Sequence, residues 1–214
     1  MTDFGHGSGA AETPDFPGPV HEIGPATAAD GPGITRVHLL ATRDTFQGRP
    51  NNLLLLSLDE FLLTDFAPRK LAMWTDLGAT GDPGLLVART IDGEVAGFIH
   101  SGIREDEHRR IGVIEAWYVH PDWHGHGVGR DLMRSALDYL ERAGAEQIHA
   151  DTTGGTKAVE RYEGHGFRQS AEVATVTALQ DRTGIPTPQI LMVRDCSGSR
   201  SAAASTETPV RRPH

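Results

Sequence analysis

The sequence has a single cysteine and no long apolar run, and both shortages exclude classes of protein. Cys196 is the only cysteine among 214 residues, so no intrachain disulfide can form. This composition fits a reducing cytoplasm, where we expect the protein to reside. No apolar run is longer than Leu53–Leu56, far short of the ~20 residues that cross a bilayer. The first residues also lack a basic start followed by an apolar stretch, so we expect neither a secretory signal nor a membrane partner.

Basic residues are outnumbered by acidic ones. The chain has 20 Lys and Arg against 29 Asp and Glu, a formal net charge of −9. No stripe of basic residues is visible of the kind that neutralises a phosphate backbone. We therefore expect no nucleic-acid partner, while a net negative charge weakly favours a cationic one.

Both ends of the chain are rich in Gly, Pro, Ser and Ala and show no apolar periodicity. Segments that bury little apolar surface cannot offset the entropy lost on ordering. We expect disordered tails at residues 1–33 and 197–214. The remaining stretch, 34–196, is long enough for one domain with a core.

Apolar periodicity and turn residues predict a mixed α/β order within this domain. The clearest helix covers 128–143, where an apolar stripe recurs at helical spacing and Gly144 follows as a cap. The pattern predicts one mixed sheet, flanked by helices, with a central crossover. The other expected elements are a strand at 34–41, a helix at 53–66 stopped by Pro68, a short helix at 70–77, a hairpin at 84–103 turning at Asp92-Gly93, a polar loop at 104–110, a strand at 111–119, a strand at 147–152, a helix at 157–163, and strands at 167–177 and 188–193.

Three histidines and three glycines crowd the loop before the clearest helix, which reads HPDWHGHGVG from His120. A zinc site needs imidazoles that converge on one point. His120, His124 and His126 straddle a strand end, a turn and a loop, with no cysteine and no HExxH motif beside them. We therefore expect no metal site here.

The glycines of this loop favour an anion site. A helix start has free N–H groups and the positive end of the helix dipole. Gly125, Gly127 and Gly129 have no Cβ, so their backbone can curl with its N–H groups toward a phosphate. The loop is neither GxGxxG nor a GK[ST] P-loop, which disfavours a dinucleotide or ATP. The alternative is a plain flexible turn.

The context of the loop resembles the GCN5-related N-acetyltransferase (GNAT) family. The loop of that family reads Arg/Gln-x-x-Gly-x-Gly/Ala, and here it is His124-Gly-His-Gly127-Val-Gly129. A Tyr-x-x-x-Gly-Phe motif follows on a helix in the family, and here it is Tyr162-Glu-Gly-His-Gly166-Phe167. The resemblance covers residues 84–194. It implies a GNAT-like sheet and transfer of an acetyl group from acetyl-CoA to a primary amine of a small molecule or peptide.

The resemblance also implies which residues contact acetyl-CoA. The N–H groups of the loop and first helical turn would take the pyrophosphate, and the strand before the loop would run beside the pantetheine arm. Two positions depart from the family: His124 replaces the usual Arg or Gln, and Gly155 replaces an Asn that contacts the cofactor in many members. The implied contact residues are Trp117, Tyr118, Val119, His124, Gly125, His126, Gly127, Val128, Gly129 and Arg130.

Two residues are the candidates for proton transfer. Tyr162 would protonate the leaving thiolate; the alternative is a packed aromatic ring. Glu115, in an otherwise apolar strand, would accept a proton from the amine or hold the ammonium group, because alternation places it on the same face as Trp117 and Val119, the residues at the acyl end of the donor. The alternative is a solvated carboxylate or one paired with Arg109 or Arg110. His149 and Asp151 on the next strand are reserve bases.

Three functions are compatible with the sequence. The first is an N-acetyltransferase, the second a non-catalytic acyl-CoA-binding sensor on the same fold, and the third a His-rich metal-binding module. Some aminoglycoside 2′-N-acetyltransferases resemble the strand at 111–119, including the acid four residues before Val119, which hints at an antibiotic-like amine. The acceptor and the oligomeric state, a homodimer included, are not encoded in any recognisable motif.

Overall fold

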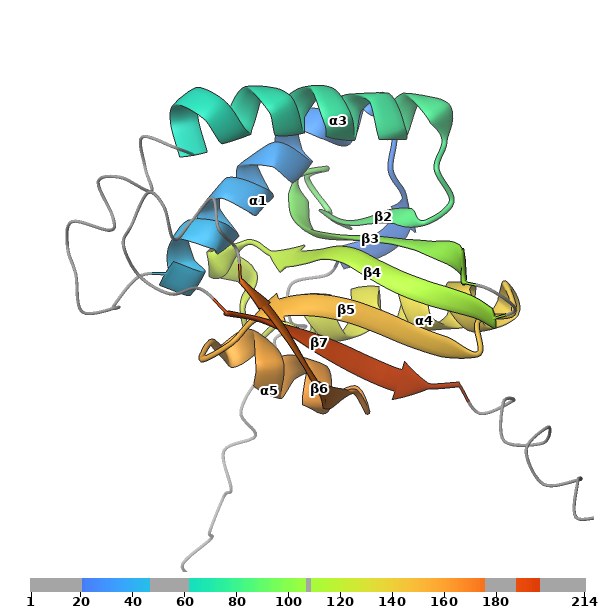
Figure 1. The fold of residues 1–214 in the computed structure, drawn as a ribbon. Helices are drawn as coiled ribbons and strands as arrows, with labels where there is room; N and C mark the ends of the chain where they lie inside the picture. Colours follow the sequence, from blue (N-terminus) through green and yellow to red (C-terminus); the bar gives the residue numbers. More distant parts are fainter. Residues whose placement is uncertain (1–20, 47–61, 107–108, 176–187, 197–214) are drawn as a thin grey trace, which may run out of the picture.

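In the computed structural model, the chain folds into a seven-stranded mixed sheet with helices on both faces (Figure 1). The structure describes residues 21–46, 62–106, 109–175 and 188–196. In chain order the elements are β1 (His21–Pro25), η1 (Ala28–Asp30), α1 (Gly31–Phe46), η2 (Leu62–Phe66), α3 (Ala67–Thr80), β2 (Leu85–Thr90), β3 (Val95–Asp106), β4 (Arg109–Val119), η3 (Pro121–Trp123), α4 (Val128–Arg142), β5 (Gln147–Thr153), α5 (Lys157–Glu163), β6 (Arg168–Thr175) and β7 (Pro188–Asp195).

The strands lie in the order β1-β2-β3-β4-β5-β7-β6. Strands β4 and β5 are parallel and all other neighbours are antiparallel. Helix α4 makes the crossover that a parallel pair requires. The β4–β5 pairing covers only Ile111–Ile114 with Gln147–Ala150. Beyond these residues the two strands separate, and this opening in the sheet positions the candidate site.

Two hydrophobic cores cover the two faces of the sheet. The first lies under α4 and α5, and it includes the predicted stripe of α4, from Leu132 to Leu140. The second lies under α1 and α3, where Trp74 and Phe98 are almost fully buried. Figure 1 shows α1 and α3 on one side of the sheet and α4 and α5 on the other. The predicted mixed α/β fold with one crossover is therefore confirmed.

The N-terminal part of the domain differs from its prediction. Residues 34–41 form a helical part of α1 and not a strand, because the buried residues Ile34, Val37, His38 and Ala41 recur at helical spacing. Residues 21–33 were expected to be disordered, yet they contain β1, η1 and the start of α1. Gly33 is a packing position: a Cβ there would lie 2.7 Å from Val95 Cγ2.

A buried carboxylate holds this N-terminal segment in place. Asp30 accepts hydrogen bonds from the backbone N–H and the hydroxyl of Thr27, both at 2.7 Å, and from Arg89 of β2 at 2.6 Å. Such charge-assisted bonds explain why a Gly- and Pro-rich stretch is ordered. The expected tails at residues 1–20 and 197–214 lie outside the described residues.

Two other predictions need correction. Residues 104–110 were expected to be a loop, but 104–106 belong to β3 and 109–110 to β4, where Glu105 faces Arg110 and Asp106 faces Arg109. Opposite charges across an antiparallel pair stabilise such a pairing. Pro68 lies in the first turn of α3 and does not stop a helix, because N–H groups there need no partner. Of the helix expected at 53–66, residues 53–61 lie outside the described ranges.

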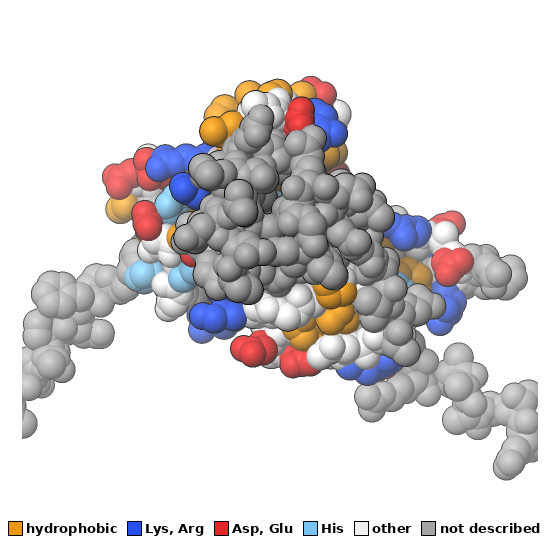
Figure 2. Space-filling view, turned by 60° about the vertical axis from the view of Figure 1, so that its left-hand side comes forward, with side chains coloured by type: hydrophobic (Ala, Val, Ile, Leu, Met, Phe, Trp, Pro, Cys, Tyr) orange, Lys and Arg blue, Asp and Glu red, His pale blue; other side chains and the backbone are white. Residues whose placement is uncertain are grey.

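The surface visible in Figure 2 has acidic and basic side chains interspersed at its edges. Within the described ranges, no helix combines the length and the apolar composition needed to cross a membrane.

The second core predicts a stability effect. The Phe98 side chain is fully buried, with its ring centroid 5.0 Å from that of Trp74 and 5.6 Å from that of Tyr118. Phe98→Ala should lower the free energy of unfolding by about 3–5 kcal/mol, because it removes buried apolar surface and leaves a cavity. Denaturant unfolding measures this. The control Ile91→Ala, at a side chain that is 88% exposed, should change it by less than ~0.5 kcal/mol. Equal effects of the two would contradict this packing.

Candidate functional site

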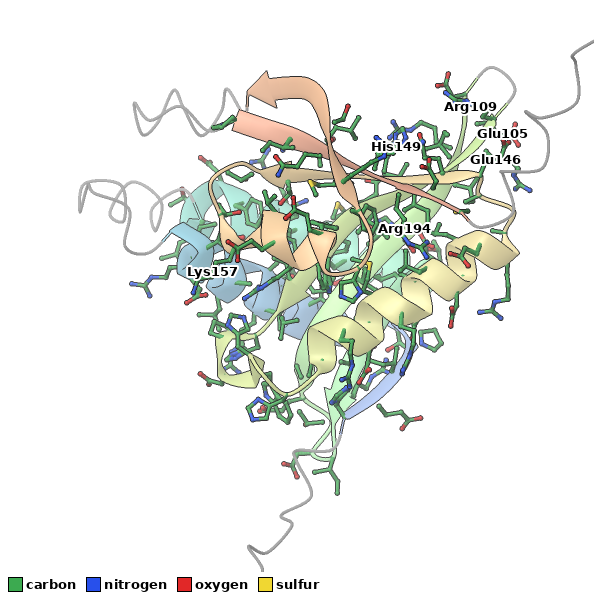
Figure 3. All side chains as sticks on the ribbon, turned by 90° about the horizontal axis from the view of Figure 1, so that it is seen from below. Glu105, Arg109, Glu146, His149, Lys157 and Arg194 are labelled. Carbon is green, nitrogen blue, oxygen red and sulfur yellow. The ribbon has the colours of Figure 1, made fainter. Side chains whose placement is uncertain are left out.

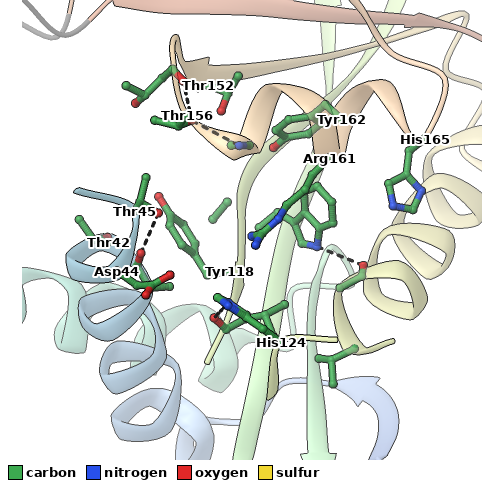
Figure 4. Close-up of a pocket in the computed structure, with 18 of the residues that line it drawn as sticks. Thr42, Asp44, Thr45, Tyr118, His124, Thr152, Thr156, Arg161, Tyr162 and His165 are labelled. Atoms are coloured by element: carbon green, nitrogen blue, oxygen red, sulfur yellow. Dashed lines mark hydrogen bonds between the residues drawn. The ribbon is translucent and has the colours of Figure 1, made fainter. Parts of the chain in front are cut away.

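A cavity of about 410 Å³ opens where β4 and β5 separate. Figure 4 shows α1 on one side of it, α4 on the other and α5 across one end. Its lining comes from α1, β4, the loop before α4, the first turn of α4, β5, α5 and β7. The predicted site residues Glu115, Trp117, Tyr118, Val119, His124, Gly125, Gly127, Val128, Gly129, Arg130 and Tyr162 all line the cavity, and His126 does not.

A β-bulge determines where Glu115 lies. His100 pairs with Ala116 and Ser101 with Ile114, so Glu115 has no partner on β3. The bulge changes which face later residues occupy, since Ile114 packs in the first core and Ala116 in the second. Simple alternation along the strand, which the prediction for Glu115 assumed, therefore does not determine where this side chain lies. The bulge leaves it exposed in the lining of the cavity.

Three carboxylates from three elements line this cavity: Asp44 of α1, Glu115 of β4 and Asp151 of β5. Glu115 and Asp151 each directly follow the last paired residues of the parallel strands, Ile114 and Ala150. Within the described ranges, none of the three forms an ion pair with Lys or Arg. Lys70 acts on Glu115 only through a Coulombic interaction and not through an ion pair. Carboxylates that outnumber the arginines in one cavity, and that form no ion pairs there, favour a cationic ligand.

The glycine loop ends in a helix start without a side-chain cap. Gly127 is the N-cap residue of α4, with φ at 81°, and no side chain accepts the first N–H groups of the helix. Gly125 also has positive φ, at 83°. Gly129 has helical φ, and its role is close packing, because a Cβ there would lie 3.3 Å from Val119 Cγ2. The first turn of α4 therefore presents N–H groups to the cavity.

A hydrogen bond joins β4 to this helix start. The indole Nε1–H of Trp117 donates to the carbonyl oxygen of Gly129 at 3.2 Å. The bond holds the end of β4 against the first turn of α4. It explains why an aromatic residue with a donor stands at this position of the strand.

The three histidines of the loop have separate surroundings. His124 Nε2 lies 3.3 Å from the carbonyl oxygen of Val119, and His120 Nδ1 accepts the N–H of Asp122 at 3.2 Å. The His126 ring lies against Trp123, with 5.8 Å between centroids. In the part of the chain that the structure describes, no three His, Cys, Asp or Glu residues gather as metal ligands would.

Tyr162 of α5 is buried beside the cavity, with 5% of its surface exposed. Its ring packs edge-on against Trp117 and Phe167, at centroid distances of 5.1 and 5.3 Å. Its hydroxyl faces the cavity in Figure 4, and no described residue hydrogen-bonds to it. Burial raises the pKa of Tyr162, and the charges of Tyr118 and Asp151 raise it further. The hydroxyl therefore stays protonated at ordinary pH and is available as a donor.

The structure separates the two reserve bases. Asp151 lines the cavity and His149 does not. Figure 3 shows His149 toward the end of the sheet that carries Arg109, far from Lys157 at the start of α5. His149 Nε2 lies 2.6 Å from Gln147 Oε1. Burial and the charge of Arg109 lower the pKa of His149.

Several lining residues were not anticipated from the sequence. Asp44 and Thr45 belong to α1, whose helical spacing at Ile34–Ala41 was the available signal. Arg161 precedes Tyr162 on α5 and also lines the cavity. The sequence shows that Arg161 precedes Tyr162 of the motif, but it does not show that the Arg161 side chain points into the cavity.

A carboxylate in the first turn of α4 ties β1 to the loop. Asp131 lies 3.1 Å from His21 Nε2, 3.2 Å from Arg130 Nε and 3.4 Å from Arg134 Nη2. Burial alone would raise the pKa of Asp131, but the bonds from Arg130 and His21 and the charge of Arg134 lower it overall.

This network predicts a pH-dependent stability difference. A carboxylate whose pKa falls on folding stabilises the protein above its unfolded pKa, near 3.8, and that contribution is lost as the pH falls through the folded pKa. Asp131→Asn should therefore lower stability by about 1 kcal/mol at pH 7, which is roughly 2–4 °C in Tm. Thermal unfolding from pH 7 to pH 3 should show the two proteins converging below pH 4. A constant difference would refute the charge-based explanation.

The chain is similar in sequence to a known family and to individual proteins. Residues 53–167, more than half of the chain, match the Acetyltransferase (GNAT) family. The chain is 28% identical over 126 residues to an aminoglycoside N(6′)-acetyltransferase type 1 from Stenotrophomonas maltophilia, covering 50% of this chain and 81% of that one. It is 35% identical over 88 residues to a mycothiol acetyltransferase from Propionibacterium freudenreichii, covering 40% of this chain but only 28% of that one.

Solved structures show the same fold at low sequence identity. The PaiA N-acetyltransferase from Thermoplasma acidophilum, in complex with coenzyme A, aligns with a TM-score of 0.62 and 14% identity, covering 83% of this chain and 99% of that one. YncA, a putative acetyltransferase from Salmonella typhimurium with acetyl-CoA, aligns with a TM-score of 0.58 and 22% identity, covering 88% and 99%. These likenesses confirm the predicted fold.

Proposed function

Because the chain belongs to the acetyltransferase (GNAT) family, we propose that it transfers an acetyl group from acetyl-CoA to a primary amine of a small cationic acceptor. The observation that carries this proposal is the composition of one cavity. An uncapped helix start and three carboxylates that form no ion pair with any described residue line the same space. The first suits an anionic donor and the second a positively charged acceptor.

The helix start fits the phosphates of the donor. The N–H groups from Gly125 to Arg130 would hold the pyrophosphate, and a Cβ built at Gly125 would meet open space, so the backbone of the loop is accessible to a ligand. The strand end Trp117–Val119 would lie along the pantetheine arm, with the Val119 N–H toward the thioester oxygen. The coenzyme A and acetyl-CoA complexes among the solved neighbours support this choice of donor.

The acidic lining would handle the acceptor. Glu115 or Asp151 would hold the ammonium group and take its proton, so that the free amine can attack the thioester carbon. As the new C–N bond forms and the C–S bond breaks, Tyr162 would donate its proton to the leaving thiolate. The raised pKa of Tyr162 keeps that proton in place until it is needed. The nitrogen loses its second proton to solvent as the amide forms, solvent reprotonates the tyrosine, and the carboxylate releases the proton that it took.

The acceptor class follows from the same lining. A cavity of about 410 Å³ suits a small molecule or the end of a peptide. Asp44, Glu115 and Asp151 contribute three negative charges, which favours an acceptor with more than one ammonium group. The aminoglycoside N(6′)-acetyltransferase among the relatives acts, by its name, on an acceptor of this kind.

The direct test is release of free coenzyme A from acetyl-CoA in the presence of candidate amines. A panel of aminoglycosides, polyamines, amino acids and peptides should reveal turnover, with the fastest rates for polycationic acceptors. Binding of acetyl-CoA without turnover of any amine would instead support the sensor function on the same fold. Failure to bind acetyl-CoA would refute both.

The loop glycine Gly127 predicts a specific loss of donor binding. Gly127→Val forces a branched side chain to adopt φ of 81° and should displace the first N–H groups of α4. We expect coenzyme A affinity, measured by calorimetry, to fall more than about tenfold. Gly93→Val is the matched control, because Gly93 has φ of 80° in the β2–β3 turn, with open space around it. If both folded variants bind coenzyme A like the wild type, the loop is not the phosphate site.

The hydroxyl of Tyr162 predicts a loss in the chemical step alone. Tyr162→Phe keeps the packed ring and should lower kcat by about 10²–10⁴-fold, the range for positioned acids, with unchanged acetyl-CoA affinity. Because the pKa of Tyr162 is raised, the wild-type hydroxyl stays protonated to high pH, and the deficit should not shrink up to pH 10. Tyr139→Phe, at a half-buried tyrosine outside the cavity, should leave kcat unchanged. A near-normal kcat in Tyr162→Phe would restrict this tyrosine to packing.

A further inference from the structure

Arg130 and Arg161 both line the cavity, and of the two only Arg130 forms an ion pair with a described residue. Arg130 is paired with Asp131, with 3.2 Å between Nε and Oδ1. Arg161 of α5 is exposed and forms no ion pair with any described residue. Figure 4 shows its side chain reaching from α5 into the middle of the cavity, between Tyr162 and His124. Arg161 therefore places an uncompensated positive charge inside the site.

The packing of α5 sets this direction. Val159 and Tyr162 are buried in the first core and fix the rotation of the helix. Ala158 and Arg161 lie three residues apart on α5 and both line the cavity, as does His165 just beyond the end of the helix. Residues three apart share one face of a helix. With Val159 and Tyr162 held in the core, the neighbouring face of α5 therefore presents Arg161 to the cavity.

Other side chains near the start of α4 add little positive charge to the cavity. Asp131 in the first turn of α4 engages Arg130, Arg134 and His21. His124 Nε2 lies 3.3 Å from the carbonyl oxygen of Val119, which engages one of its two ring nitrogens. The helix start therefore offers N–H groups but little net positive charge from side chains, and an anion bound there would be neutralised only in part.

We propose that Arg161 binds a phosphate of the donor, across the cavity from the N–H groups of α4. This inference rests on the proposed function, because it takes acetyl-CoA as the donor. The planar guanidinium matches phosphate oxygens in a bidentate geometry. Asp44, Glu115 and Asp151 line the same cavity but form no ion pair with Arg161. The guanidinium is therefore available to bind a phosphate. The phosphate then lies between α4 and α5, with the N–H groups of α4 on one side and the Arg161 guanidinium on the other.

The experiment compares a donor that has phosphates with one that lacks them. Calorimetry measures coenzyme A binding to the wild type, Arg161→Leu, Arg161→Lys and the control Lys157→Ala, which changes an exposed cation of α5 outside the cavity. Turnover is measured in parallel with acetyl-CoA and with S-acetyl-pantetheine, which has no diphosphate. Thermal unfolding confirms that each variant is folded.

Arg161→Leu should weaken coenzyme A binding by about 10–100-fold, the range for a charge-assisted hydrogen bond. Arg161→Lys should recover part of this affinity, and Lys157→Ala should bind like the wild type. With S-acetyl-pantetheine, kcat/KM should stay within about twofold in all variants. Equal losses with both donors would assign Arg161 to the thioester or the acceptor and overturn the inference, as would unchanged coenzyme A affinity. A wild type that does not bind coenzyme A would instead refute the proposed function itself.

Discussion

Strands β4 and β5 pair over four residues, Ile111–Ile114 with Gln147–Ala150, and then separate. A continuous parallel pair would fill this region with backbone hydrogen bonds and leave no room between the strands. The separation exposes strand edges in the middle of the sheet, where α1, α4 and α5 surround them and create the cavity (Figures 1 and 4). Glu115 and Asp151 lie just beyond the last paired residues, so the same break that opens the cavity also places its carboxylates.

The helix start is held to this opening by contacts that leave its N–H groups free. Trp117 bonds the carbonyl oxygen of Gly129 and not an N–H group, which fixes the helix without occupying a donor. Asp131 faces β1 through His21, and does not cap the helix. The first turn of α4 is therefore rigidly placed while its donors remain available. Such preorganisation lowers the cost of binding an anion.

The sequence correctly predicted the elements that are determined by residues close together in the chain. The stripe of α4, the Asp92-Gly93 turn and the strand ending at Val119 were all read from residues close in sequence, and the structure confirms them. The motif that includes Tyr162 also lines the cavity as expected. These features were predictable because helical period, turn preference and loop composition are properties of short segments.

The remaining features arise from contacts between distant segments. Residues 21–33 are ordered because Asp30 meets Arg89 of β2, a partner 59 residues away. The bulge at Glu115 depends on the register between β3 and β4. The direction of Arg161 depends on how Tyr162 packs against Trp117. None of these contacts leaves a period or a motif in the sequence, so composition and spacing could not reveal them.

The proposed function requires the donor to lie between the separated strands with its phosphates on the first turn of α4. Amide hydrogen exchange with and without coenzyme A can locate the donor, because it reports which backbone N–H groups the ligand covers. We expect slower exchange over Gly125–Arg130 and Trp117–Val119, and unchanged exchange in β1 and β2 at the far edge of the sheet. Protection confined to other segments, with none at Gly125–Arg130, would contradict this placement of the donor.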